Sequence, residues 1–376
     1  MLLTLAQFTL SPLRLVLSFR RPLIKVLQSR REDRAMSTSS SASTTAVPVP
    51  RPSASLVVIN SRNEILLVHR NPKARSFGGM TVCQHPFPII HSELTSGNQP
   101  KVFPGGNYDK KQDSSLAVTA IRETFEESGL LLASPRNALS SDVTLDDTQL
   151  EDARHSIHQQ RLLFQDFLKS SHLKADTDTL LPFTQWITPI GPPRRFHTQF
   201  FVTFLPAASS AGFSSGAKQE RIPKPVKTSG SHLNIDGGQE VISARFIHPT
   251  TALEEFREGK ITFMPPQFYI LTTLCNILKG SQSTDDQQAQ VAKLSQGAFG
   301  RMVINPRQRK PEDGDLAQGY SILTYEGDET RGGSRGRLHR AKVRMVDGTI
   351  KEIILQRNFD IFSQIEVNLF QGASKL

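Results

Sequence analysis

The pattern of apolar and polar residues predicts a chain that mixes strands with helices. Short β-branched runs between polar turns are typical of strands, and apolar residues recurring every three or four positions are typical of amphipathic helices. By these signs we expect strands at 55–59, 65–70, 184–188, 196–205 and 240–247, and a hairpin around the turn 346–349. The same signs predict helices at 114–128, 148–169, 249–258 and 265–279. Because the elements follow no regular βαβ rhythm, the predicted fold class is α+β or a sandwich, not a doubly wound sheet.

Composition shifts mark the boundaries of the folded part. Residues 37–53 are rich in Ser, Thr and Pro and cannot bury a core, so we expect the fold to begin near Ser55. The stretches 206–238 and 280–298 are rich in Ser, Gly and Gln and are expected to be loops. The chain therefore divides into a disordered leader with its linker, one main domain, and a second linker with a β-rich extension, at 1–54, 55–280 and 281–376.

The net charge of +10 over 376 residues is unevenly placed. Residues 1–35 carry seven Lys or Arg and two acids. Their net charge of +5 is half of the net charge of the chain. A Leu- and Arg-rich segment without acids before Glu32 is typical of a targeting sequence, and the alternative is an untranslated leader with Met36 as the true start. Polar residues and Pro12 interrupt it too early for a membrane span. The other five charges are spread too thinly to favour a nucleic-acid partner.

The chain ends in Ser374-Lys375-Leu376. At a C-terminus these three residues form an address that the peroxisomal import receptor reads, so we expect a peroxisomal protein. The two cysteines, Cys83 and Cys275, fit a reducing compartment. The alternative location is the mitochondrion, if the Arg-rich leader is translated and used.

The segment Arg122-Glu123-Thr124-Phe125-Glu126-Glu127-Ser128-Gly129-Leu130 gathers acidic side chains. Glu126 and Glu127 follow Glu123 by three and four positions, so a helix places all three carboxylates on one side. Arg122 can pair with Glu126, but it is one cation among three anions. Mg²⁺ or Mn²⁺, which prefer oxygen ligands, would relieve the repulsion. The alternative interpretation is a solvated acidic helix face.

The strand end Phe103-Pro104-Gly105-Gly106 lies upstream of this helix. Together the two segments resemble the Nudix hydrolase family, which pairs a glycine loop with an Arg-Glu-x-x-Glu-Glu-x-Gly helix. The resemblance implies an α/β/α sandwich with a mixed sheet. It also implies that Glu123, Glu126 and Glu127 carry a metal ion, with Glu127 and Glu123 catalytic, and that Arg122 orients the carboxylates.

The glycine half departs from the family pattern. The family spacing would place a Gly at position 108 and an early Glu at position 114, where this chain has Tyr108 and Ser114. Removing residues 83–102 would join Val82 to Phe103, which is the usual approach to the glycine loop. We therefore hypothesise that 83–102 is a retained intron or a gene-model error, the alternative being a genuine loop insertion. Its Cys and His residues have no standard zinc spacing.

Further segments resemble the Nudix branch that includes peroxisomal coenzyme A diphosphatases, namely 186–189, 194–201, 240–246 and 265–268. The resemblance implies hydrolysis of the pyrophosphate bond of CoA or acyl-CoA to 3′,5′-ADP and (acyl-)4′-phosphopantetheine. One alternative keeps the chemistry but takes NADH or ADP-ribose as substrate. Another is a catalytically inactive Nudix fold used for binding.

Other residues are candidates for the same site. Glu240, which follows Asp236-Gly237-Gly238, is a candidate general base, and its alternative is an ordinary exposed strand residue. The substrate-binding candidates are Gly105, Gly106, Arg70, Arg194 and Arg195, because a Gly turn admits a ligand close to the backbone and guanidinium groups suit phosphates. We expect Trp186, Phe196 and His197 to be structural.

Overall fold

The computed structural model describes residues 47–70, 101–136, 145–206, 220–221 and 241–365. The leader 1–35, nearly all of the segment 83–102 and the terminal Ser374-Lys375-Leu376 lie outside these ranges. So does Glu240. Among the residues described, no helix is both long and apolar enough to cross a bilayer.

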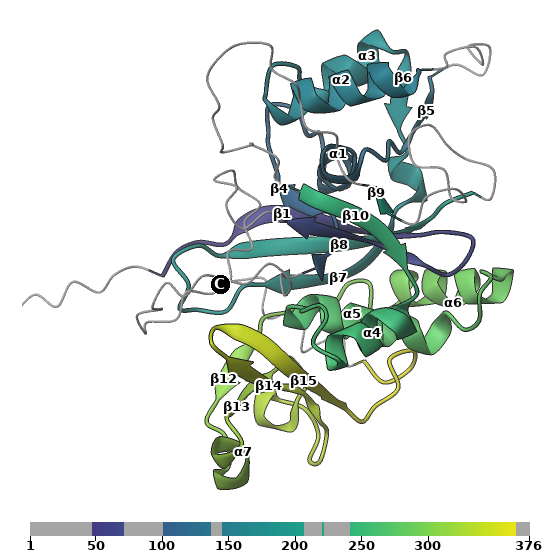
Figure 1. Cartoon of the computed structure of the whole chain (residues 1–376). Helices are drawn as coiled ribbons and strands as arrows, with labels where there is room; N and C mark the ends of the chain where they lie inside the picture. Colours follow the sequence, from purple (N-terminus) through teal and green to yellow (C-terminus); the bar gives the residue numbers. More distant parts are fainter. Residues whose placement is uncertain (1–46, 71–100, 137–144, 207–219, 222–240, 366–376) are drawn as a thin grey trace, which may run out of the picture. The chain divides into compact units, whose positions relative to one another are not determined.

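A mixed nine-stranded sheet forms the centre of the fold (Figure 1). Its main path runs β11 (Val303–Ile304), β7 (Leu181–Ile187), β8 (Phe196–Phe204), β1 (Arg51–Ile59), β2 (Ile65–Arg70), β10 (Val241–Ile247) and β9 (Glu220–Arg221). Two short strands lie beside this path, β3 (Lys101–Val102) next to β2 and β4 (Gly105–Asn107) next to β1. β1 runs parallel to β8 but antiparallel to β2 and β4, so the sheet is mixed as expected.

Helices cover both faces of the sheet, which gives the expected α/β/α sandwich (Figure 1). One face carries α1 (Leu116–Ser128), α2 (Asp147–His158), α3 (Phe164–Ser170), the strand pair β5 (Ala133–Pro135) and β6 (Leu173–Ala175), and a 3₁₀ turn at Thr177–Thr179. The other face carries α4 (Pro249–Arg257), α5 (Pro265–Ile277) and α6 (Asp285–Gln296).

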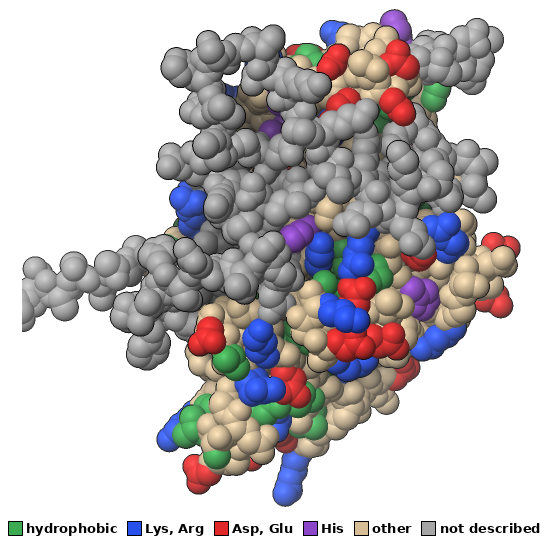
Figure 2. All heavy atoms as spheres, viewed as in Figure 1, with side chains coloured by type: hydrophobic (Ala, Val, Ile, Leu, Met, Phe, Trp, Pro, Cys, Tyr) green, Lys and Arg blue, Asp and Glu red, His purple; other side chains and the backbone are tan. Residues whose placement is uncertain are grey.

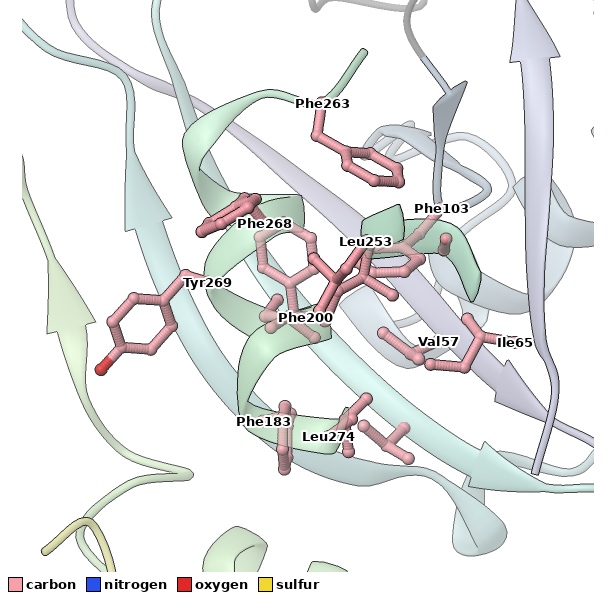
Figure 3. Close-up of a cluster of buried hydrophobic side chains, with 14 of the residues drawn as sticks. Val57, Ile65, Phe103, Phe183, Phe200, Leu253, Phe263, Phe268, Tyr269 and Leu274 are labelled. Atoms are coloured by element: carbon pink, nitrogen blue, oxygen red, sulfur yellow. The ribbon is translucent and has the colours of Figure 1, made fainter. Parts of the chain in front are cut away.

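Strand β1 shows why the sheet has two cores. Successive side chains of a strand point to opposite faces. Ala54, Leu56 and Val58 therefore join the core beneath α1, whereas Val57 and Ile59 join the core on the α4 and α5 side. Figure 3 shows Val57 in this second core among Phe200, Leu253, Phe263 and other residues of α4, α5 and the sheet.

A four-stranded antiparallel sheet forms the C-terminal extension, as predicted. Its order is β12 (Arg307–Arg309), β13 (Tyr320–Thr324), β14 (His339–Val346) and β15 (Thr349–Arg357), with α7 (Asp313–Ala317) before β13 and a 3₁₀ turn at Glu329–Arg331. The predicted hairpin joins β14 to β15, and both Asp347 and Gly348 have positive φ, as a type I′ turn requires. Buried Tyr325, Ala341 and Ile353 belong to the same core as α5, so the residues on either side of 280 share one core.

Three predicted boundaries need correction. The expected helix 148–169 is two helices, because the chain breaks after His158 and Gln160 takes a positive φ of 56°. The expected loop 280–298 contains α6, whose start is a capping box between Thr284 and Gln287 that composition alone conceals. The first strand begins at Arg51, ahead of Ser55, because β4 and β8 pair with its early residues.

Charged side chains are interspersed in the view of Figure 2. Lys and Arg lie among Asp and Glu over the surface of the C-terminal sheet and the neighbouring helices. The described residues in this view form no continuous basic patch of the kind that follows a nucleic-acid backbone.

Candidate active site

The turn into β4 approaches both β1 and helix α1 so closely that only glycine fits. A Cβ atom on Gly105 would lie 2.4 Å from the carbonyl oxygen of Ala54. A Cβ atom on Gly106 would lie 2.4 Å from Oε1 of Glu123. The two glycines therefore let the backbone of β4 lie directly against a carboxylate of α1.

Glu127 is held by this same turn. The backbone N–H of Gly105 donates to its Oε2 at 3.0 Å, and the residue is only 3% exposed. The sequence assigned both residues to the site separately, and the structure brings them together. This contact fixes the carboxylate of Glu127 at the junction of strand and helix.

Arg122 joins the other two glutamates. Its Nη1 donates to Oε1 of Glu123 and to Oε1 of Glu126, each at 2.8 Å, and its Nη2 donates to the carbonyl of Asn107 at 2.9 Å. The pairing of Arg122 with Glu126, predicted from their spacing, is confirmed. The guanidinium thus links the glycine turn to the acidic side of α1.

Asp113 is a member of this cluster that the sequence did not predict. It does not cap α1, because the cap is Ser115, whose side chain accepts from the N–H of Val118. Asp113 instead accepts from Nε and Nη2 of Arg122, each at 2.8 Å, and from the hydroxyl of Thr119 at 3.0 Å. It lies one position before Ser114, where the family pattern expects a glutamate. The sequence does contain a sign of this role: Asp113 is an acidic residue one position away from the glutamate of the family pattern, in a loop that is longer than usual.

The carboxylates keep Arg122 charged despite its burial. Burial alone would lower the pKa of Arg122, but the hydrogen bonds to Asp113 and the charges of Glu123 and Glu126 raise it above its ordinary value. Arg122, which is only 4% exposed, is therefore a permanent cation.

Helix α2 contributes two further contacts to Glu126. Nδ1 of His158 lies 3.6 Å from Oε2 of Glu126, and Nη1 of Arg154 donates to the backbone carbonyl of Glu126 at 2.8 Å. Burial would raise the pKa of Glu126, but contact with His158 and the charge of Arg122 lower it below its usual value. Glu126 is therefore ionised at neutral pH. Sequence spacing could not find these partners because α2 follows α1 through a separate segment.

The donor atoms suit a hard divalent cation. Asp113, Glu123, Glu126 and Glu127 supply only carboxylate oxygens, and Arg122 leaves their negative charge in excess. Within the described ranges, however, no three or more acidic, His or Cys side chains converge as a metal cage. Glu123 and Glu126 face Arg122, and Glu127 faces Gly105. The oxygen donors of these residues suit a divalent metal ion. In this structure, however, the side chains are arranged around Arg122.

The predicted substrate-binding arginines are placed differently from one another. Arg195 is buried, and its Nε and Nη1 donate to the carbonyls of Thr188 and Pro48 at 2.9 and 3.1 Å, which is a structural use of the guanidinium. Arg194 is exposed. Arg70 ends β2 and pairs across the sheet with Val241, the residue that follows Glu240.

The aromatic residues and His197 are structural, as expected. Trp186 and Phe196 are 3% and 6% exposed. His197 contacts Oε1 of Gln185 through Nε2 at 2.7 Å, and burial lowers its pKa.

Comparison with known proteins agrees with this geometry. Residues 79–212 match the family model described as the NUDT19 Nudix domain. This part of the chain resembles a Nudix domain. The match includes the glycine turn and the whole of α1, so the resemblance drawn from these two segments is confirmed.

Curated relatives resemble part of the chain. Acyl-coenzyme A diphosphatase NUDT19 of Xenopus laevis is 32% identical over 170 residues, covering 42% of this chain and 39% of that protein. The human protein of the same name is 30% identical over 173 residues, covering 44% and 40%. Putative nudix hydrolase 7 of Caenorhabditis elegans is 26% identical over 189 residues, covering 47% and 50%. The matches span about two fifths to one half of the relatives' length.

Among solved structures, a NUDIX hydrolase from Alicyclobacillus acidocaldarius aligns with 61% of this chain and 93% of its own. The TM-score is 0.41 and the sequence identity is 22%. The sandwich is defined by the strands and helices of this chain itself.

Proposed function

We propose that this chain is a metal-dependent Nudix diphosphatase that hydrolyses the pyrophosphate bond of CoA or acyl-CoA. The products would be 3′,5′-ADP and (acyl-)4′-phosphopantetheine. The observation that carries the proposal is the cluster in which Arg122 joins Asp113, Glu123 and Glu126 beside the Gly105–Glu127 contact. The names of the NUDT19 relatives support the choice of CoA esters as substrates.

The glutamates of α1 would hold the metal ion. Glu123, Glu126 and Glu127 offer oxygen donors for Mg²⁺ or Mn²⁺, which when bound neutralises anionic pyrophosphate oxygens and lowers the pKa of a water. Arg122 limits the motion of Glu123 and Glu126 by holding one oxygen of each. Gly105 does the same for Glu127 through its N–H. The chain thereby keeps its carboxylates positioned before substrate arrives, which is where such sites gain most of their catalytic effect.

The proposal also needs a general base and a cation for the substrate phosphates, and we look for both near the end of β2. Arg70 pairs with Val241, the residue that follows Glu240 in the sequence, and β10 packs against α1. We assign Glu240 as the general base and Arg70 as a cation for substrate phosphates. Arg194, which is exposed, is a second candidate for the substrate.

The terminal Ser374-Lys375-Leu376 supports a peroxisomal location within this proposal. The proposed location and the proposed substrate are tested separately, because an import signal does not select a substrate. A fluorescent fusion at the N-terminus, compared with the same fusion lacking Leu376, tests the location. Unchanged distribution after removal of Leu376 would speak against the signal.

A substrate panel tests the activity. The purified chain is incubated with Mg²⁺ or Mn²⁺ and with CoA, an acyl-CoA, NADH or ADP-ribose, and the products are separated by chromatography. We expect 3′,5′-ADP from the CoA substrates and nearly complete loss of activity in Glu127→Gln. Brisk cleavage of NADH or ADP-ribose without cleavage of CoA esters would replace the substrate assignment. Full activity in Glu127→Gln would overturn the site itself.

A further inference from the structure

A pocket lies in the C-terminal extension, between the segment that precedes β14 and the segment that follows β15. Its volume is about 520 Å³, and Ser334, Arg335, Arg337, Phe359 and Ser363 are among its lining residues. Volumes of about 300–1,000 Å³ are typical of small-molecule sites. In Figure 1 the C-terminal sheet and α1 lie on opposite sides of the central sheet, so this pocket is separate from the glutamates of the Nudix helix.

Hydrogen bonds tie the two walls of the pocket together. Nδ2 of Asn358 donates to the carbonyl of Gly336 at 2.9 Å, and the N–H of Leu338 donates to Oδ1 of Asn358 at 2.7 Å. Nη2 of Arg337 donates to the carbonyl of Gln364 at 2.5 Å. The pocket is thus a built feature of the extension and not a gap between unconnected loops.

Arg337 is pre-oriented at the pocket. Its guanidinium carbon lies 3.7 Å from the centre of the Phe359 ring. Phe359 is itself held edge-on against the buried His339, with ring centroids 5.0 Å apart. A guanidinium stacked on an aromatic face keeps its N–H groups in one plane, where they can form paired hydrogen bonds with an oxyanion.

The charge of the lining is positive. It contains Arg335 and Arg337 but no Asp or Glu. Two acids nearby already have partners: Glu329 accepts from Arg340 and from the N–H of Gly336, and Asp360 accepts from Ser363 and the N–H of Phe362.

Arg335 differs from three other arginines of the extension. Arg331, Arg340 and Arg344 each pair with a carboxylate. Arg335 is exposed at the pocket and has no hydrogen bond or ion pair with any residue that the structure describes. Its guanidinium is therefore available to an external anion.

We propose that this pocket binds a small molecule carrying a phosphate group. The two guanidinium groups carry two positive charges, which match a phosphate dianion. A ligand with a single carboxylate would neutralise only one of them. The hydroxyls of Ser334 and Ser363 border the same space, and its volume exceeds that of phosphate alone. The proposal does not depend on the activity of the Nudix site.

Calorimetric titration of the full chain tests the site, with metal ions removed and with inorganic phosphate and ADP as separate probes. We expect binding that weakens about tenfold or more in Arg335→Gln, because a charge-assisted hydrogen bond is lost. Arg309→Gln is the matched control, since Arg309 lies in the same extension but pairs with Glu312. Arg337→Lys should also weaken binding while keeping the charge, because the planar fork is lost.

The two probes and a variant of the Nudix helix locate the binding. ADP binding more tightly than phosphate assigns the pocket to nucleotide-sized ligands, and equal affinities assign it to the phosphate group alone. Glu127→Gln should leave the affinity of this pocket unchanged. Absence of binding by either probe, or equal affinity in Arg335→Gln and the unmodified chain, would overturn the proposal.

Discussion

Arg122 and Asp113 form a two-point contact at the centre of the Nudix site. Nε of Arg122 donates to Oδ1 of Asp113 and Nη2 donates to Oδ2, each at 2.8 Å. The Asp113 side chain is 0% exposed and that of Arg122 is 5% exposed. A buried pair of this geometry fixes the plane of the guanidinium, and so fixes which carboxylates of α1 the remaining N–H groups reach.

Asp113→Asn tests this positioning role. The amide has the same shape but no charge, so it leaves the buried cation undercompensated. We expect a loss of about 3 kcal/mol in the free energy of unfolding, measured by urea denaturation, because breaking a buried ion pair is costly. We also expect a lower kcat with little change in KM, since Arg122 acts on the carboxylates and not on the substrate. Asp113→Glu, which keeps the charge, should recover part of the activity. Equal stability of Asp113→Asn and the unmodified chain would contradict the assignment.

Gly106→Ala tests the close approach of β4 to the helix. The added methyl group would lie 2.4 Å from the Glu123 carboxylate, so either the strand or the carboxylate must move. A misplacement of about 1 Å at a reacting group costs on the order of 100-fold in rate, and we expect a fall of that size in kcat/KM. Gly314→Ala is the control, because a Cβ atom there would meet nothing within 4 Å. Equal kcat/KM in the two variants would show that the contact does not matter.

Deletion of residues 83–102 should leave the sheet intact. Lys101 and Val102 form β3, which pairs with His69 and Val68 of β2. In the shortened chain Thr81 and Val82 would stand directly before Phe103, so a valine again fills the position that is 4% exposed in Val102. The backbone N–H of Lys101 donates to the carbonyl of Thr262. Thr81, which takes the place of Lys101 in the shortened chain, has the same backbone N–H.

Thermal unfolding of the two forms checks this expectation. We expect melting temperatures within a few degrees of each other, because shortening a connection changes its closure entropy only slightly. Val102→Asp in the full chain is the destabilising control, since it buries an unpaired charge. A shortened chain that fails to fold would show that 83–102 is a required part of the domain. Transcript sequencing across codons 80–104 separately tests its origin.

Much of the fold follows from local sequence patterns, whereas half of the site does not. The turn at Asp347-Gly348 and the pair Arg122–Glu126 depend on residues at most four positions apart, and both were predicted. Asp113 reaches Arg122 only because a lengthened loop returns to the helix, and the partners His158 and Arg154 arrive on another helix. These contacts are set by tertiary packing, so no periodicity in the sequence reports them. Helix α6 was missed for the opposite reason: a local signal was present, but its polar composition resembled a loop.

His339 predicts how the stability of the chain depends on pH. The residue is fully buried, and its Nε2 contacts the hydroxyl of Tyr269 at 2.9 Å while Nδ1 contacts the carbonyl of Glu326 at 2.6 Å. Burial lowers its pKa from 6.5 to about 3, outweighing the contact with Glu326, and the charges of Arg357 and Arg337 lower it further. The unfolded chain therefore binds this proton more readily than the folded chain does.

The sign of the effect follows from that difference. Above pH 6.5 the histidine is neutral in both states and costs nothing. As the pH falls from 6.5 towards 3, only the unfolded state is protonated, so stability is lost by up to about 1.4 kcal/mol per pH unit. His339→Gln should lower stability at neutral pH but flatten this acid slope in urea denaturation series. His172→Asn is the control, because His172 is exposed and Asn tolerates its positive φ of 54°. An acid slope that is the same in His339→Gln as in the unmodified chain would assign the loss to other groups.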